Sequence, residues 1–159
     1  MIRYKKLHDV AQRFETWLSL RERKRMPNRN HIEQFFCLNL VSLEYIGRGA
    51  FKNCYRISKY KQPLVLKIGR RIAVDCETIN DARSRGMKRH VAKVYWHTEH
   101  CMLQKGATGE ATPEQIKKLK GKAWRRGLVD VRKANVGTLP CGRAVVYDLN
   151  RSERKTKES

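Results

Sequence analysis

The sequence predicts a mixed α+β protein built around one antiparallel sheet, and three observations support this fold class. Apolar residues recur at helical spacing near the N-terminus, short β-branched runs separated by turn residues occupy the middle of the chain, and a Thr-Pro-Glu helix start appears at residues 112–114. No internal repeat is present. A chain of 159 residues is long enough for one domain with its own hydrophobic core.

Two helices are expected first. Between residues 3 and 25, apolar side chains recur every three or four positions with lysines and arginines between them, which predicts an amphipathic helix that Pro27 ends. Asn30 fits an N-cap, and Glu33 three residues later fits a capping box for a second short helix. These segments form a basic, helical N-terminal region, residues 1–40.

The pattern then changes to short strands and single helices, which together make a domain over residues 41–150. The expected elements are three antiparallel strands near 43–46, 54–57 and 64–66, a helix over 72–83, strands over 91–96 and 101–103, a helix from Thr112 through Trp124, and short strands around a hairpin turn at 140–142. Residues 151–159 lack apolar side chains and are expected to be a disordered basic tail.

Charge is the strongest signal in the composition. Lys and Arg number 36 against 15 Asp and Glu, so the formal net charge is +21. Such a field attracts polyanions, and nonspecific binding of nucleic acid is expected from it. No zinc-finger or RNA-recognition signature accompanies the charge, which disfavours nucleic-acid binding as the main role.

The five cysteines are odd in number and scattered, without a Cys-x-x-Cys pair, which argues against a disulfide framework and a zinc site. No apolar run is long enough to span a bilayer, and no stretch of signal-peptide character follows the N-terminus. We therefore expect a cytoplasmic protein without a membrane partner.

Several residues suggest chemistry on phosphate. Gly47 and Gly49 lie between two expected strands, where backbone N–H groups can approach phosphate oxygens, although an ordinary hairpin turn also explains them. Lys67 interrupts an apolar strand and is either a buried cation that needs a counter-charge or the exposed side of an edge strand. Glu77 on the following helix is a candidate counter-charge, and Asp81 on the same helix face competes with it.

Asp130, Asn135 and Asp148 supply two carboxylates and an amide oxygen near the ends of short strands, a donor set that suits magnesium. One of the aspartates can instead orient or deprotonate an attacking hydroxyl. Structural explanations exist for each residue: a turn or capping aspartate, a left-handed turn residue before Gly137, and the end of a strand.

Five segments in this order resemble the protein kinase-like family, most closely its very small members encoded by bacteriophages and those similar to aminoglycoside and lipopolysaccharide kinases. The resemblance covers roughly residues 43–149, and its segments are Ile46–Phe51 with Tyr55, Val65–Ile68, Cys101–Gly106, Asp130–Asn135 and Val145–Asp148.

The resemblance implies ATP and magnesium as cofactors and a role for each matching residue. Gly47 and Gly49 would cover the phosphates, Lys67 would bind them and pair with Glu77, and Asp130 would act on the attacking hydroxyl. Asn135 and Asp148 would hold the metal. The segment containing Met102, Gln104 and Lys105 would hold adenine through its backbone.

The chain also departs from the family pattern. Lys52 replaces the third glycine, Leu128-Val129 replaces His-Arg before the catalytic aspartate, and Asp148-Leu149-Asn150 lacks the Phe and Gly of the usual motif. The chain ends soon after Asp148, so the expected fold is kinase-like with an antiparallel N-lobe sheet, an N-terminal helical extension and a severely truncated C-lobe.

The leading functional hypothesis is a minimal phosphotransferase that binds ATP and magnesium, with a host protein, its own residues or a small molecule as acceptor. A pseudokinase that binds a partner protein or nucleic acid without catalysis is the alternative, and a basic nucleic-acid-binding protein without a nucleotide site is the third. If the chain is phage-encoded, it acts in the host cytoplasm.

Overall fold

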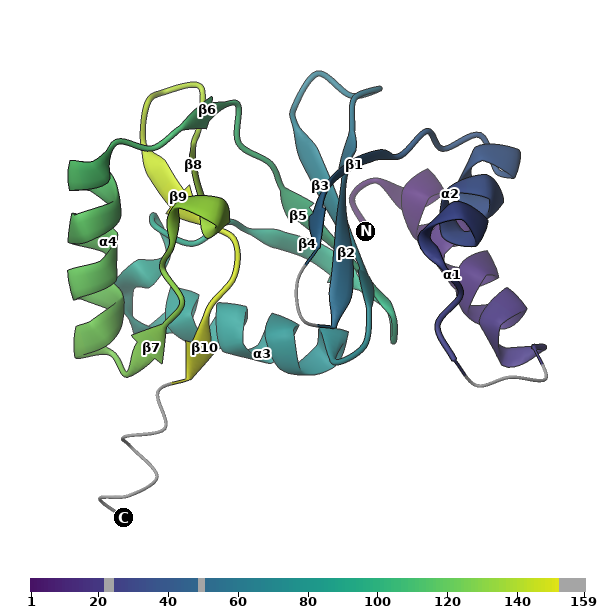
Figure 1. Cartoon of the computed structure of the whole chain (residues 1–159), viewed down its shortest axis with the longest axis horizontal. Helices are drawn as coiled ribbons and strands as arrows, with labels where there is room; N and C mark the ends of the chain where they lie inside the picture. Colours follow the sequence, from purple (N-terminus) through teal and green to yellow (C-terminus); the bar gives the residue numbers. More distant parts are fainter. Residues whose placement is uncertain (22–24, 49–50, 152–159) are drawn as a thin grey trace, which may run out of the picture. The chain divides into compact units, whose positions relative to one another are not determined.

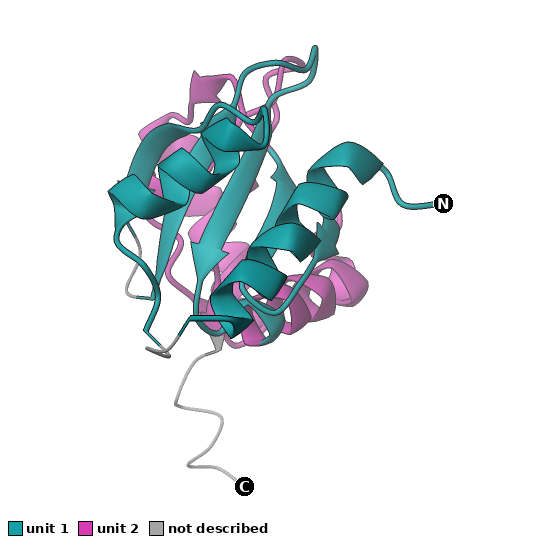
Figure 2. Ribbon diagram, turned by 90° about the vertical axis from the view of Figure 1, so that its right-hand side faces the viewer, with its two compact units in different colours: residues 1–73, 94–105 teal, residues 74–93, 106–159 magenta. Residues whose placement is uncertain are grey.

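The computed structural model describes residues 1–21, 25–48 and 51–151, and Figure 1 shows the course of the chain. Over these residues the fold is mixed α+β, with four α-helices and an antiparallel five-stranded sheet. The chain divides into two compact units: residues 1–73 with 94–105, and residues 74–93 with those from 106 onward (Figure 2). They are called unit 1 and unit 2 below.

The sheet of unit 1 confirms the expected antiparallel arrangement. Its strands run in the spatial order β1-β2-β3-β5-β4, and every neighbouring pair is antiparallel. The strands are β1 (Glu44–Arg48), β2 (Lys52–Ile57), β3 (Leu64–Gly69), β4 (Val94–His97) and β5 (Cys101–Lys105).

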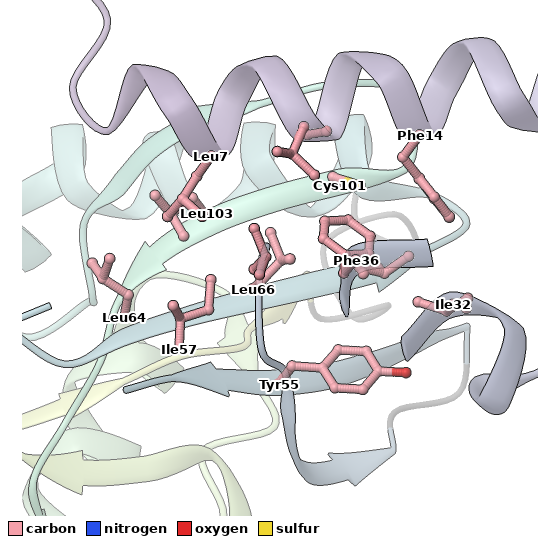
Figure 3. Packing of buried hydrophobic residues seen from close by; sticks show 14 of the residues in the cluster. Leu7, Phe14, Ile32, Phe36, Tyr55, Ile57, Leu64, Leu66, Cys101 and Leu103 are labelled. Atoms are coloured by element: carbon pink, nitrogen blue, oxygen red, sulfur yellow. The ribbon is translucent and has the colours of Figure 1, made fainter. Parts of the chain in front are cut away.

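Two helices, α1 (Lys5–Ser19) and α2 (Arg29–Leu38), pack on one face of this sheet (Figure 3). Their buried side chains meet the apolar residues that alternate along the strands, because successive residues of a strand point to opposite faces. The labelled members of this core are Leu7, Phe14, Ile32, Phe36, Tyr55, Ile57, Leu64, Leu66, Cys101 and Leu103. Burial raises the pKa of the Cys101 thiol, consistent with a reduced core cysteine.

The N-terminal helices differ from the sequence prediction in two details. The predicted first helix, over residues 3–25, is too long, since α1 ends at Ser19 and Leu20 after it is exposed; residues 22–24 of the predicted range lie outside the described part of the chain. The predicted N-cap Asn30 is wrong. Asn28 caps α2 by accepting a hydrogen bond from the His31 N–H, and Glu33 pairs with Arg29 at 2.7 Å instead of closing a capping box.

Unit 2 contains most of α3 (Ile72–Ala82), followed by an irregular helical turn at residues 83–87 in which Gly86 has a φ of 93°. Helix α4 (Pro113–Arg125) begins as predicted, since Thr112 and Gln115 form a reciprocal capping box. A three-stranded sheet has the order β6-β8-β9, from β6 (Gly109–Glu110), β8 (Val136–Thr138) and β9 (Ala144–Val146). A separate ladder pairs β7 (Leu128–Val129) with β10 (Asn150–Arg151).

The short antiparallel pair β8–β9 confirms the expected hairpin around residues 140–142. Strand β10 takes in the first residue of the expected C-terminal tail, and the remaining residues of that tail, 152–159, lie outside the described part of the chain. Among the described residues, none of the helices has the length and apolar character needed to cross a membrane.

Candidate functional site

The two faces of the five-stranded sheet differ in chemistry. Leu66 and Ile68 of β3 belong to the core beneath the helices, so Lys67 between them takes the opposite face. The strand register places Lys67 directly between Cys54 of β2 and Met102 of β5. One face of the sheet is therefore an apolar core, and the other carries a cation in its middle.

The position of Lys67 excludes one of the two explanations drawn from the sequence. Strand β3 is the central strand of the sheet, and the Lys67 side chain is only 2% exposed, so it is not the solvated side of an edge strand. A charge at this depth is stable only where negative groups or hydrogen-bond acceptors compensate it. Its burial thus favours a role in binding or ion pairing.

Gly47 lies in β1 opposite Cys54, on the same side of the sheet as Lys67. The register of β1 shifts between Tyr45 and Gly47, which marks a bulge at this point of the strand. A Cβ atom added to Gly47 would meet no atom within 4 Å. The direction in which a side chain would project from Gly47 is therefore open, while the strand itself pairs with β2. Gly49 lies outside the described residues.

The segment expected to hold adenine forms β5. Met102 and Gln104 are fully buried and share the face of Lys67, since they lie opposite Lys67 and Val65 in the register. Lys105, opposite Leu64, takes the other face. Strand β5 thus puts two buried side chains of different polarity beside Lys67.

The candidate partners of Lys67 lie on α3. Asp81 binds Arg85, one turn further along, through a hydrogen-bonded ion pair of 3.0 Å. Glu77 is exposed on the same helix. Arg85 lies in the irregular turn that follows α3, and the choice between Glu77 and Asp81 stays a prediction.

Asp130 begins the loop that holds the remaining candidates in unit 2. It follows β7 and has a φ of 74°, in the left-handed region that side-chain-bearing residues seldom adopt. The Asn135 side-chain amide donates a hydrogen bond of 3.0 Å to the Asp130 carbonyl oxygen and so closes the loop. Such conformations concentrate at functional sites, where surrounding contacts hold them.

The β8–β9 hairpin connects Asn135 to Asp148. Val136 pairs with Val146, and the Tyr147 N–H donates a hydrogen bond of 2.8 Å to the Asn135 carbonyl oxygen. Asp148 is the next residue after Tyr147. The hairpin therefore returns the chain to Asn135 just before the second carboxylate, that of Asp148.

Asn150 is a residue that the sequence analysis did not single out as a site residue. Its side-chain amide donates a hydrogen bond to a carboxylate oxygen of Asp130, and the pairing of β10 with β7 places Asn150 opposite Val129. Leu128-Val129, noted above as a departure from the family pattern, thus anchors the loop through this ladder. The sequence shows Asn150 as an amide residue two positions after Asp148, which is the one feature that could have drawn attention to it.

These contacts link the Asp130 loop to Asn135 and bring Tyr147, the residue before Asp148, to the Asn135 backbone within unit 2. The Asn135 amide nitrogen is used in the loop, and its oxygen accepts no hydrogen bond from the described residues. An amide oxygen and a carboxylate are ligands that magnesium accepts together with phosphate oxygens and water. The side chains of Asn135 and Asp148 are thus of a type that magnesium accepts, and the Asp130 carboxylate is oriented by Asn150.

Comparisons with known proteins give limited guidance. No protein-family model matches the chain. No curated protein matches it either. Among solved structures, the chain resembles the erythromycin complex of Rv3197 from Mycobacterium tuberculosis, with a TM-score of 0.46 and 12% sequence identity. The match covers 67% of this chain and 45% of that one, so it spans less than half of the neighbour's length.

Proposed function

We propose that this protein is a minimal kinase-like phosphotransferase that binds ATP with magnesium and transfers the γ-phosphoryl group. Lys67 binds the phosphates, and the backbone at Gly47 approaches them. Asn135 and Asp148 hold the metal ion, and Asp130 orients the acceptor hydroxyl and receives its proton. Magnesium supplies charge neutralisation at the transferred phosphoryl group when it is bound.

The observation that carries this proposal is the hairpin that joins Asn135 to Asp148 while the loop from Asp130 closes on Asn135. A hydroxyl-orienting carboxylate and two oxygen ligands for a metal are the groups that phosphoryl transfer requires from a protein. Their grouping within a short stretch of chain supports a catalytic site better than three unrelated turn residues.

The sheet of unit 1 supports the nucleotide half of the proposal. A buried lysine in the central strand, flanked by apolar and amide side chains, suits a ligand that has both a charged and a planar part.

Binding is tested first by thermal unfolding with and without ATP and magnesium. A ligand that binds only the folded protein raises the melting temperature. We expect a magnesium-dependent rise for the unaltered chain, which Lys67→Met and Asp148→Asn each abolish. The matched control Lys61→Met removes an exposed lysine of unit 1 and should retain the full rise.

The same assay separates the two acidic residues of α3. Glu77→Gln should reduce the effect of ATP, whereas Asp81→Asn should lose only its ion pair with Arg85. Equal loss in both variants would contradict the assignment of Glu77 as the partner of Lys67.

Turnover distinguishes an enzyme from a pseudokinase. Asp130→Asn should abolish ADP formation and autophosphorylation, read by intact mass, and should keep the rise produced by ATP and magnesium. A chain that binds ATP but shows no turnover with itself, host proteins or small hydroxyl compounds would support the pseudokinase alternative. No ATP effect at all would refute the nucleotide site.

A further inference from the structure

We propose that unit 1 carries a second site, which binds single-stranded nucleic acid, on the side of the sheet opposite Lys67. A cavity of about 670 Å³ lies there between the start of α2, strand β1, the beginning of β2 and the end of β3. This volume is in the range of sites that hold a ligand of nucleotide size. Every residue that lines the cavity belongs to unit 1.

The cavity is strongly cationic. Arg25, Arg29, Arg48, Lys52 and Arg70 line it, and among the residues that the structure describes no acidic one does. Glu33 neutralises Arg29 through an ion pair of 2.7 Å. The side chains of Arg25, Arg48 and Arg70 are exposed and form no ion pair with the described residues. Three exposed arginines that have no ion-pair partner among the described residues favour an anionic ligand.

Aromatic rings accompany the cations. Phe51 lines the cavity and is 54% exposed, so its ring is accessible to a ligand. Tyr45 also lines it, and the Arg29 guanidinium lies 3.8 Å from the centroid of its ring. Aromatic rings within a basic groove are the feature by which proteins bind single strands, because bases stack on the rings and phosphates meet the cations.

The strand register places Tyr45, Arg48 and Asn53 of this site on the helix-covered face, whereas Lys52, opposite Gly69, is in register with the face of Lys67. Tyr45 pairs with Tyr55, a core residue beneath α2, and Arg48 pairs with Asn53 two positions away on the same face. Gly47 pairs with Cys54, which lies beside Lys67 on the other face. The consecutive residues Gly47 and Arg48 of β1 thus lie on opposite faces of the sheet, one toward the proposed ATP site and one toward the proposed nucleic-acid site.

A single strand fits these features better than a lone phosphate or a duplex. The free arginines come from three separate segments, so they suit a backbone with several phosphates rather than one anion. Stacking on Phe51 needs an unpaired base, which a duplex does not offer. The net charge of +21 adds long-range attraction but selects no site.

Fluorescence anisotropy with labelled oligothymidylate and oligouridylate of about a dozen nucleotides tests the proposal at several salt concentrations. The variant R25Q/R48Q/R70Q should bind at least about tenfold more weakly than the unaltered chain, and the slope of log K against log salt should fall by about 2, since each single-strand phosphate contact contributes about 0.7. The two oligonucleotides show whether ribose or deoxyribose is preferred.

The matched control K117Q/K118Q/K120Q removes the same charge from exposed lysines of α4 in unit 2. It should keep the affinity and the slope. Equal losses in the two triple variants would overturn the proposal, because binding would then follow the overall field.

Phe51→Ala should weaken binding about fivefold or more without changing the salt slope, since it removes a stacking partner and no charge. An unchanged affinity, or equal binding of a duplex of the same length, would also overturn the proposal. Unaltered melting temperatures show that the variants fold. Lys67→Met should leave oligonucleotide binding intact, so failure of this site and failure of the ATP site give different results.

Discussion

The side-chain amide of Asn150 donates a hydrogen bond to the carboxylate of Asp130, which lies 20 residues earlier in the chain. Two ladders make the contact possible: β7 with β10 sets Asn150 opposite Val129, and β8 with β9 returns the chain toward the loop. A neutral amide fixes the direction of a carboxylate without cancelling its charge. Asn150 is therefore a positioning residue for the proposed acceptor site.

Removal of this amide should affect turnover more than nucleotide binding. Asn150→Ala should lower the rate of phosphoryl transfer about tenfold or more, because a misdirected base no longer reaches the acceptor. Asn150→Asp, of nearly the same shape, should lower it further, since two carboxylates then repel each other. Steady-state kinetics would show a loss in kcat with little change in KM for ATP. A change in KM alone would contradict the positioning role.

Replacement by alanine should affect the stability of the fold very differently at two glycines of unit 1. At Gly69 an added Cβ would collide with the Phe51 carbonyl oxygen and lie 2.5 Å from the Lys52 Cα, so Gly69→Ala should destabilise the fold by about 1–3 kcal/mol. Gly47→Ala meets no atom and should change stability by less than about 0.5 kcal/mol. Urea unfolding measures both effects.

The same Gly47→Ala protein should nevertheless show a smaller ATP-induced rise in melting temperature, because a methyl group keeps phosphate oxygens away from the backbone. Full ATP binding by this stable variant would remove Gly47 from the proposed site.

His90 should make stability depend on pH. Burial first, and then the nearby cations led by Lys122, whose Nζ lies 2.9 Å from His90 Nε2, lower the pKa of this imidazole below 6.5. The unfolded chain therefore takes up the proton first as pH falls, so stability is lost as the pH drops through 6.5 toward the folded-state pKa.

Denaturant unfolding at about pH 7.5 and about pH 5.5 checks this expectation. The loss of stability between the two values should shrink in His90→Gln, which cannot be protonated, and in Lys122→Met, which removes the closest cation. A loss of the same size in both variants would assign the pH dependence to other groups.

The two asparagines at the start of α2 should differ sharply. Asn28→Ala removes the side chain that accepts the His31 N–H and should destabilise unit 1 by about 1 kcal/mol. Asn30→Ala alters an exposed residue inside the first turn and should change stability by less than about 0.5 kcal/mol. Thermal or urea unfolding distinguishes the two, and the reverse order would place the cap at Asn30.

The errors at the helix ends have a local cause, whereas most elements could be predicted from their pattern. Apolar and β-branched runs between turn residues predict the sheet strands, and the Thr-Pro-Glu start predicts α4. Asn28 and Asn30 are chemically identical as caps, and only the path of the chain after Pro27 decides which amide meets a free N–H. Ser19 ends α1, and no capping residue or proline marks this end in the sequence before Pro27.

The site was predictable only in part, for a similar reason. Asp130 and Asn135 are only five residues apart, so their spacing in the sequence suffices to identify them as a pair. A hydrogen bond between the two residues closes the loop that they bound. The role of Asn150 depends on the ladder between β7 and β10, two-residue strands too short to leave a periodic signal. The burial of Lys67 follows from the central position of β3 in the sheet. That position depends on the order of the strands in space, which the sequence pattern does not show.

The β8–β9 hairpin also has a consequence for folding. Asp130, Asn135 and Asp148 are joined by loops of a few to about a dozen residues, and closing such loops costs little chain entropy compared with long-range pairing. Hairpins of this size form in about 1–10 μs. The proposed metal ligands therefore come together early and locally, and a circularly permuted chain that keeps residues 128–151 continuous should still assemble them.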